Sequence, residues 1–408
     1  MAMATSMAMA AASTTTVTNI HETEENQRYK KGVRHLCESG ITTLPTKYVL
    51  PFADRPNQGP HHHHHHHHRS RTQSSSPAGT NNKNNHNINL PLIDFADFTS
   101  TSTPTKRAHA LHSLATACEE YGFFQVINHG ISPEVVQGMM ESSRCFFDLP
   151  FEERAKYMSN DMSAPVRYGT SWNQNKDGVF CWRDFLKLTH PTSTSTDRHH
   201  HHHHHSSQWP STPTGFRETA GAYAKETRTL FVKLAEAVLE SLGVADGSGE
   251  SMLRELGEGS QMMVLNCYPS CPEPDLTLGM PPHTDYGFLT LLLQDAVPGL
   301  EIQSGGSWLP VQPRPGSFVV NVGDHLEIFS NGRYKSVLHR VRVNSTQSRI
   351  SVASLHSLPH SSVIGPSPAL VNERNPRRYG DTDFAAFLRY LTAGKDRTET
   401  FLDSIKLN

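Results

Sequence analysis

A series of short apolar runs in the last third of the chain constrains the fold most. Pro, Gly and Asn separate these runs from Gln261 onward. They cover residues 262–268, 288–293, 300–303, 308–311, 317–322, 337–343 and 349–355. Several short strands with turn signals between them favour a β-sandwich or barrel over a parallel α/β sheet. We therefore predict a mainly β core in this part of the chain.

Amphipathic helices are predicted before the β-rich segment. Thr105 is expected to cap a helix whose apolar residues recur three or four positions apart, and another helix begins near Pro133. Residues 217–242 carry one continuous apolar stripe, and Gly243 follows where a helix commonly ends. We expect this long helix to support the sheet from outside.

Two polar tracts interrupt the chain. His61–His68 precedes a Ser- and Asn-rich stretch, and His199–His205 lies among Ser, Thr and Pro. Such compositions cannot bury a core, so both tracts are predicted to be expanded loops. The predicted organisation is a disordered tail (1–31), an N-terminal segment (32–57), a low-complexity linker (58–87), an N-terminal region with a polar His insert at 192–207 (88–215), a support helix (216–258), a β core (259–360) and a C-terminal strand and helix region (361–408).

Charge and composition exclude several partners. The formal net charge is −2, which gives no reason to expect nucleic acid or an anionic membrane surface. No apolar run is long enough to span a bilayer. The first 20 residues are rich in Ala, Ser, Thr and Met, as in plastid transit peptides, but they contain no Arg. We therefore expect a cytoplasmic protein with a disordered tail, although the sequence does not separate cytoplasm from nucleus.

The candidate metal ligands are His283 and Asp285, with His339 following 56 positions after His283. Two residues that are two apart on an extended strand share one face, so both can reach one metal. Two imidazoles and one carboxylate leave several positions open on ferrous iron, as oxygen activation requires. Zinc hydrolases keep only one open position. The alternative pair, His325 and Glu327, lies too close to His339 in sequence for opposing strands.

Four further polar residues are predicted to line the same site. Arg349 and Ser351 alternate on a strand just after His339, and an Arg fork with a hydroxyl suits a carboxylate. We expect this pair to anchor a dicarboxylate cosubstrate. Asn266 and Tyr268 alternate in the same way and add an amide and a phenol. The alternatives are an ordinary surface Arg and a core Tyr.

These residues lie in stretches that resemble the plant 2-oxoglutarate- and Fe(II)-dependent dioxygenases. The resemblance runs from about Gly32 to the C terminus, apart from the two polar tracts. The stretches are GFFQVINHG (122–130), NCYP (266–269), PHTD (282–285), NGRYKSVLHR (331–340) and RIS (349–351). PVRYGTS (165–171) and CWRDF (181–185) are similar to the subgroup of flavanone 3-hydroxylase-like, salicylate-hydroxylating and melatonin-hydroxylating enzymes.

The resemblance implies a fold, a reaction and a set of roles. The fold would be a double-stranded β-helix (jelly roll) over 259–360, with flanking helices. His283, Asp285 and His339 would bind Fe(II), and Arg349 and Ser351 would hold the distal carboxylate of 2-oxoglutarate. Tyr268 would assist them, and Asn266 would lie near the keto-acid end. A monomer would then hydroxylate a flavonoid, phenolic, indole or hormone with O2, releasing succinate and CO2, and ascorbate would activate it.

The organic substrate is expected in an apolar pocket above the iron. Tyr286 and Phe288 beside the ligand strand, and Trp172, Phe180 and Phe185 from the N-terminal region, are the candidate lining residues, with core packing as the alternative role. Two other functions fit the same residues. One is an iron oxidase on this scaffold that does not consume 2-oxoglutarate, and the other is a non-catalytic small-molecule receptor.

Overall fold

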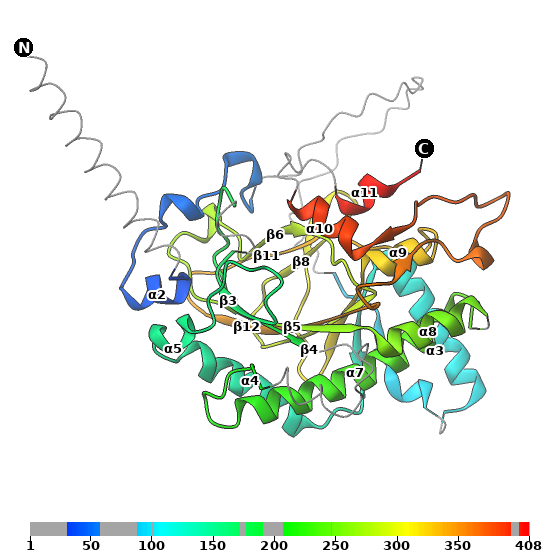
Figure 1. Cartoon of the computed structure of the whole chain (residues 1–408), viewed down its shortest axis with the longest axis horizontal. Coiled ribbons are helices and arrows are strands. Elements are labelled where there is room, and N and C mark those ends of the chain that lie inside the picture. Colours follow the sequence, from blue (N-terminus) through cyan, green and yellow to red (C-terminus); the bar gives the residue numbers. More distant parts are fainter. Residues whose placement is uncertain are drawn as a thin grey trace, which may run out of the picture.

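The computed structural model describes residues 31–57, 88–99, 102–171, 177–190, 207–245, 247–392 and 400–407. Most of the predicted tail (1–31), linker (58–87) and His insert (192–207) lies outside these residues, as does Trp172. None of the described helices has the length and apolar character needed to cross a membrane. The structured part of the chain forms a β core with helices along its lower and right-hand sides in Figure 1.

Two β-sheets form the core, and together they make the predicted jelly roll. The strand order of the large sheet is β1-β2-β10-β7-β12-β5-β4-β3, and that of the small sheet is β6-β11-β8-β9. The large sheet consists of β1 (Leu92–Asp94), β2 (Phe123–Ile127), β10 (Phe318–Val322), β7 (Leu289–Gln294), β12 (Arg349–Ser357), β5 (Ser260–Tyr268), β4 (Asp184–His190) and β3 (Val166–Gly169). The small sheet consists of β6 (Met280–His283), β11 (His339–Val341), β8 (Leu300–Ser304) and β9 (Ser307–Pro310).

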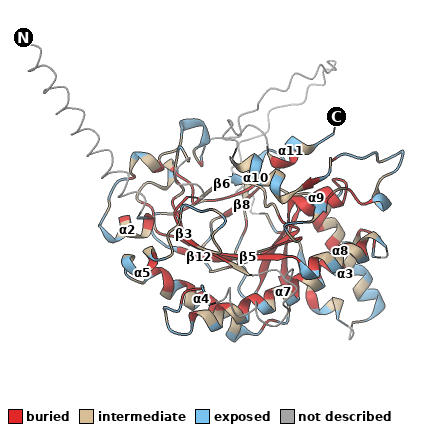
Figure 2. Ribbon diagram, in the orientation of Figure 1, coloured by how far each residue is buried: buried red, intermediate tan, exposed pale blue. Residues whose placement is uncertain are grey.

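Helices cover one face of the large sheet. They are α3 (Pro104–Thr116), α4 (Pro133–Phe147), α7 (Phe216–Ser241) and α8 (Ser248–Glu258). Their buried sides turn toward the strands and their exposed sides outward (Figure 2). Ile350 and Val352 of β12 join the core cluster beneath these helices, together with Leu265 of β5 and Leu234 of α7. Because side chains alternate along a strand, the intervening residues face the small sheet.

One predicted helix start is wrong. The hydroxyl of Thr103, not Thr105, accepts the N–H of Lys106, because Pro104 takes the first helical position. The helix predicted over residues 217–242 is confirmed as α7, and a second helix, α8, follows it within the region 216–258. Gly243 has a φ of 76°, in the left-handed region, and the chain turns there before α8 begins.

The sequence pattern missed several elements. Strands β3 and β4 were not predicted, because the basic side chains Arg167 and Lys187 interrupt their apolar runs although both are buried. The short helix α9 (Asp324–Phe329) was also missed. The remaining short elements are α2 (Val33–Glu38), α5 (Phe151–Ala155), β13 (Val363–Ile364), β14 (Thr382–Asp383), α10 (Phe384–Thr392) and α11 (Phe401–Ile405).

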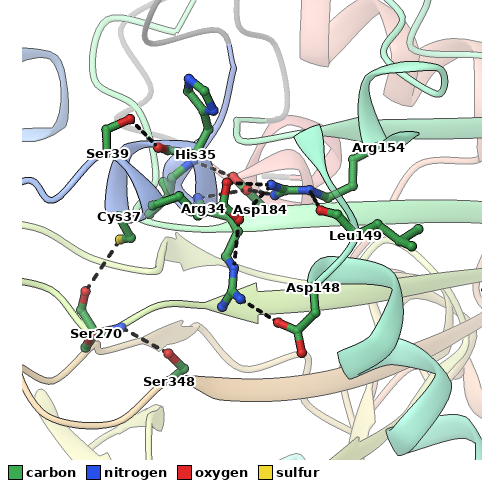
Figure 3. Close-up of polar contacts among 12 residues, drawn as sticks. Arg34, His35, Cys37, Ser39, Asp148, Leu149, Arg154, Asp184, Ser270 and Ser348 are labelled. Carbon is green, nitrogen blue, oxygen red and sulfur yellow. Dashed lines mark hydrogen bonds and ion pairs between the residues drawn. The ribbon is translucent and has the colours of Figure 1, made fainter. Parts of the chain in front are cut away.

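The N-terminal segment is fixed to the sheet by Asp184, the first residue of β4. One carboxylate oxygen accepts the N–H of Val33 at 2.7 Å, and the other accepts the N–H of Arg34 at 3.0 Å and the hydroxyl of Tyr168 at 2.7 Å. Arg154 points toward this carboxylate (Figure 3) and forms ion pairs with both Asp184 and Glu38. Helix α2 therefore begins on a buried anion, where the N–H groups at a helix start are best satisfied.

A second, smaller core forms where this segment packs. Val33, Leu36 and Tyr48 contribute to it from the N-terminal side, and Trp182 and Tyr268 from the sheet side. The indole N–H of Trp182 donates to the carbonyl of Pro269 at 3.1 Å. This cluster places the N-terminal segment directly beside the end of β5 that carries Tyr268.

Candidate functional site

His283, Asp285 and His339 converge, as the spacing predicted. Antiparallel pairing of β6 with β11 sets His283 opposite His339. The ligand atoms of all three residues lie within 4.8 Å of one another, and the Nε2 atom of each imidazole is 3.7 Å from Oδ1 of Asp285. One detail of the prediction is wrong: β6 ends at His283, so Asp285 reaches the site from the following turn and not from the strand.

Backbone carbonyls fix both imidazoles. Nδ1 of His283 lies 2.9 Å from the carbonyl oxygen of Pro281, and Nδ1 of His339 lies 3.2 Å from that of Val337. A carbonyl oxygen can only accept, so each Nδ1 carries the hydrogen and each Nε2 keeps its lone pair. Both lone pairs are therefore available on the side of Asp285, which is the arrangement that metal-binding histidines use.

Asn321 orients the carboxylate. Its amide donates to Oδ2 of Asp285 at 2.9 Å, which leaves Oδ1 facing the imidazoles. Asn321 lies on β10 opposite Thr290 of β7. The sequence prediction did not include this residue, although it is the one polar position in the run Phe318–Val322.

The charge state of the triad suits a divalent cation. Burial, and then the charge of the neighbouring His339, lower the pKa of His283 to about 4. For Asp285, burial pushes the pKa upward, but the nearby His339 and His283 outweigh it and the pKa is lowered. Metal binding requires deprotonated ligands, and these two groups are ready to bind at neutral pH. This donor set, with oxygen and imidazole ligands on one side, fits Fe(II).

A second centre lies on the inner face of the large sheet. Arg349 stands opposite Tyr268, and Ser351 opposite Asn266, across the β12–β5 pair. Arg349 donates to the Ser351 hydroxyl at 3.3 Å and to the side-chain oxygen of Gln294 at 2.8 Å. The four residues predicted for the cosubstrate thus share one face, and Gln294 is an addition from the neighbouring strand β7.

Arg349 has a free hydrogen-bond donor with which it can bind an anion. Its side chain is buried, and its Nε atom has no hydrogen-bond partner. Within the described ranges it makes no ion pair with a carboxylate, and its side chain donates to the neutral Ser351 and Gln294. A buried, unpaired guanidinium is costly, so this geometry fits a carboxylate of a bound cosubstrate.

The predicted aromatic lining residues separate in space. Phe180 packs edge-on against Tyr48, in the small core beside Tyr268. Tyr286 stacks on Phe387 of α10 with ring centroids 4.0 Å apart, so it faces the C-terminal helices. Phe288 is fully buried in the main core. Phe180 therefore shares a cluster with Tyr268, and Phe185 lies opposite Asn266 across the β4–β5 pair, whereas Tyr286 and Phe288 lie elsewhere.

The alternative pair, His325 and Glu327, has other partners. The two lie on α9, where Nδ1 of His325 is 2.9 Å from the Ser357 hydroxyl and Glu327 accepts the hydroxyl of Tyr379 at 2.6 Å. Both are buried and serve to hold α9 in place. Within the described ranges, the group of ligand side chains that can hold a metal is His283, Asp285 and His339.

Comparison with known families gives two matches. Residues 259–357 match the 2OG-Fe(II) oxygenase superfamily, and residues 90–212 match the N-terminal region of non-haem dioxygenases of morphine synthesis. Protein DMR6-LIKE OXYGENASE 2 of Arabidopsis thaliana is 36% identical over 371 residues, which is 90% of this chain and 95% of that protein. Flavanone 3-dioxygenase 2 of Oryza sativa subsp. japonica is 42% identical over 83% of this chain and 86% of its own length.

Solved structures agree with this fold. The structure of JOX2 in complex with 2OG, Fe and JA is similar with a TM-score of 0.72 and 29% identity, covering 92% of this chain and 98% of that one. The rice dioxygenase for auxin oxidation gives a TM-score of 0.64 and 28% identity, covering 78% of this chain and all of that one.

Proposed function

Because the chain belongs to the 2OG-Fe(II) oxygenase superfamily, we propose that it hydroxylates a small, largely apolar plant metabolite at the His283, Asp285 and His339 centre. The chain is a 2-oxoglutarate-dependent dioxygenase, an oxidoreductase that uses Fe(II). Its relatives act on small molecules: their names include flavanone, and one solved relative binds JA. A flavonoid, phenolic, indolic or hormone-like substrate is the class that these relatives support.

We assign the roles of the site residues as follows. His283, Asp285 and His339 would hold Fe(II) through Nε2, a carboxylate oxygen and Nε2. Arg349, with Ser351, would hold the distal carboxylate of 2-oxoglutarate. The guanidinium of Arg349 lies 5.2 Å from the ring centroid of Tyr268, so the phenol would close one side of that carboxylate site. Asn266 lies on β5, between Ser351 of β12 and Phe185 of β4.

The protein's part in the reaction is orientation and exclusion of water. When bound, ferrous iron with 2-oxoglutarate and O2 supplies the oxidising chemistry, and the overall products are the hydroxylated metabolite, succinate and CO2. Asn321 keeps one oxygen of Asp285 turned toward the metal. The Pro281 and Val337 carbonyls keep both imidazoles in the binding tautomer. Phe123 packs edge-on against His339, with ring centroids 5.4 Å apart, and covers that imidazole from water.

The convergence of the three ligand atoms carries this proposal, and turnover of labelled 2-oxoglutarate tests it. Purified protein with Fe(II), ascorbate, O2 and a panel of plant metabolites should release succinate faster when its substrate is present. His339→Ala should abolish this release, because the triad loses one ligand. His112→Ala, at an exposed position on α3, is the matched control and should keep full turnover.

Each alternative function would give a different result in these experiments. Product formation without consumption of 2-oxoglutarate would identify the oxidase. Unchanged ligand binding in His339→Ala, with no turnover in either protein, would identify a receptor. We further propose that the protein acts as a monomer, on the basis of its family, and that it acts in the cytoplasm, because its first 20 residues lack the basic start and apolar stretch of a secretory signal.

A further inference from the structure

Three basic side chains gather on strands β3 and β4, outside the residues already assigned. Arg167, Arg183 and Lys187 are between 2% and 4% exposed. The guanidinium of Arg167 lies 5.3 Å from the ring centroid of Phe185, and that of Arg183 lies 5.0 Å from the same ring. Lys187 stands directly opposite Arg167 across the β3–β4 pair. Buried cations that lie close together repel one another, and a bound anion would reduce this repulsion.

The cluster faces the candidate site and not the helices. Phe185 lies opposite Asn266, which lies opposite Ser351, so all three share the inner face of the large sheet. Arg183 donates directly to the side-chain oxygen of Asn266 at 3.1 Å. The cations therefore lie on the side of the sheet that looks toward the metal triad.

The cations keep unused hydrogen-bonding capacity. Arg167 donates from Nε to the carbonyl of Ser159, but its Nη1 has no partner. Nε of Arg183 likewise has no partner. Lys187 donates to the carbonyl of Met162. These acceptors, two carbonyls and the side-chain oxygen of Asn266, are all neutral. Asp161 and Asp177 influence Arg167 through their charge. An arginine fork with free donors suits a carboxylate.

This anion is not the cosubstrate held by Arg349. Arg349 turns to Gln294 on β7, whereas Arg167 and Lys187 lie on the other side of β12, beyond β5. Neighbouring strands are about 4.8 Å apart, so β3 lies roughly 14 Å from β12. A five-carbon dicarboxylate with bonds of about 1.5 Å spans at most roughly 6 Å. The face therefore carries two cationic centres, one on each side of Asn266 and Ser351.

We propose that Arg167, Arg183 and Lys187 bind an anionic group of the organic substrate, so that this enzyme acts on small aromatic, indolic or terpenoid carboxylic acids. The inference rests on the proposed function and narrows its substrate class. A neutral analogue would leave the three buried cations only partly balanced, by the charges of Asp161 and Asp177, and would bind more weakly.

The test is a panel of such acids, each paired with its methyl ester, assayed with the full-length enzyme by succinate release. We expect the acids to be preferred over their esters by about tenfold or more in kcat/KM. Arg167→Met and Lys187→Met should each raise the KM for the acid by about tenfold, while the KM for 2-oxoglutarate and the turnover of the ester stay within about twofold. Arg254→Met removes an exposed charge from α8 and is the matched control.

The outcomes separate this inference from the proposed function. Equal turnover of acids and esters by the unmodified enzyme would overturn the inference and leave the dioxygenase assignment intact. A KM for 2-oxoglutarate that rises with the KM for the acid would also overturn it, because the cations would then serve the cosubstrate. Succinate release with a neutral flavonoid or phenol, but with no acid and no ester, would overturn the inference alone, whereas absence of release with the whole metabolite panel would refute the proposed function itself. If Arg167→Met does not fold, Lys187→Met and the comparison of acid with ester still decide.

Discussion

Asp184→Asn should loosen the N-terminal segment and lower the stability of the whole protein. Asp184 is buried and joins α2 to β4 through the N–H groups of Val33 and Arg34 and the hydroxyl of Tyr168. An asparagine side chain has nearly the same shape, but its amide would turn N–H groups toward at least one of these donors. Arg154, with no exposed surface, would keep Glu38 and lose its second counter-charge.

The expected loss of stability can be estimated from the hydrogen-bond partners of Asp184. A hydrogen bond to a charged group contributes roughly 1.5–3 kcal/mol, and three such bonds meet at Asp184. Burial offsets part of this stabilisation. It raises the pKa of Asp184, whereas the hydrogen bonds from Tyr168 and the two backbone N–H groups lower it. Removing one member of a buried charge network commonly costs about 3–5 kcal/mol, and we expect that range here. At about 2 °C per kcal/mol for a large domain, the Tm should fall by roughly 6–10 °C.

The assay is thermal unfolding together with limited proteolysis of residues 32–57. Asp148→Asn is the matched control: it also removes a carboxylate near α2, but Asp148 is 60% exposed and pairs with Arg34 at the surface. A surface ion pair contributes about 0–1 kcal/mol, so the control should unfold almost as the original does. Equal Tm values for the two variants, or unchanged protease resistance of the segment in Asp184→Asn, would show that the buried carboxylate does not hold α2.

Three other outcomes are expected at the site. Asn321→Ala removes the hydrogen bond to Oδ2 of Asp285, so the apparent affinity for Fe(II) should fall by about 10–100-fold in a metal titration. An unchanged affinity would contradict the role of Asn321 in orienting Asp285. Arg349→Met should raise the KM for 2-oxoglutarate by roughly 100-fold or more in the succinate assay. If only the KM for the organic substrate rose, Arg349 would bind that substrate and not 2-oxoglutarate. Burial, and then the charge of Arg167, lower the pKa of Lys187 to about 8, while Asp161 opposes them. Its charge is therefore complete only below that pH, and the KM for acid substrates should rise above pH 8 in the original enzyme but not in Lys187→Met.

The sequence predicted those parts of the site that depend on local spacing. His283 and Asp285 are two residues apart, and Arg349 and Ser351 alternate on a strand, so each pair was recognisable without the fold. The pairing of His339 with His283 needed the jelly roll, which the run of short strands indicated. Asn321 could have been noted as a polar residue in an apolar run, but its partner Asp285 is brought close only by the tertiary structure.

Burial was the part that the sequence could not show. Arg167 and Lys187 read as surface charges that break a strand pattern, and the structure buries both on the inner face of the sheet. Likewise, Phe288 and Tyr286 lie near the ligands in sequence, yet one packs in the main core and the other against α10. Sequence proximity to a ligand is a weak guide here, because Tyr286 and Phe288 lie in the connection between β6 and β7, where no strand pattern fixes the direction of a side chain.

The electrostatics of the inner face connect the assigned site with the proposed acid substrate. Arg349, Arg183, Arg167 and Lys187 line one sheet, and Asp285 is the carboxylate that faces them from the triad. A ferrous ion would add two further positive charges, and the dicarboxylate cosubstrate would compensate for those two alone. The protein cations on β3 and β4 would then remain only partly balanced, by Asp161 and Asp177, in a buried setting, which is unfavourable. A neutral substrate leaves that imbalance in place, whereas a carboxylate seated between Arg167 and Arg183 removes much of it, so the charge of the fold itself argues for an acid.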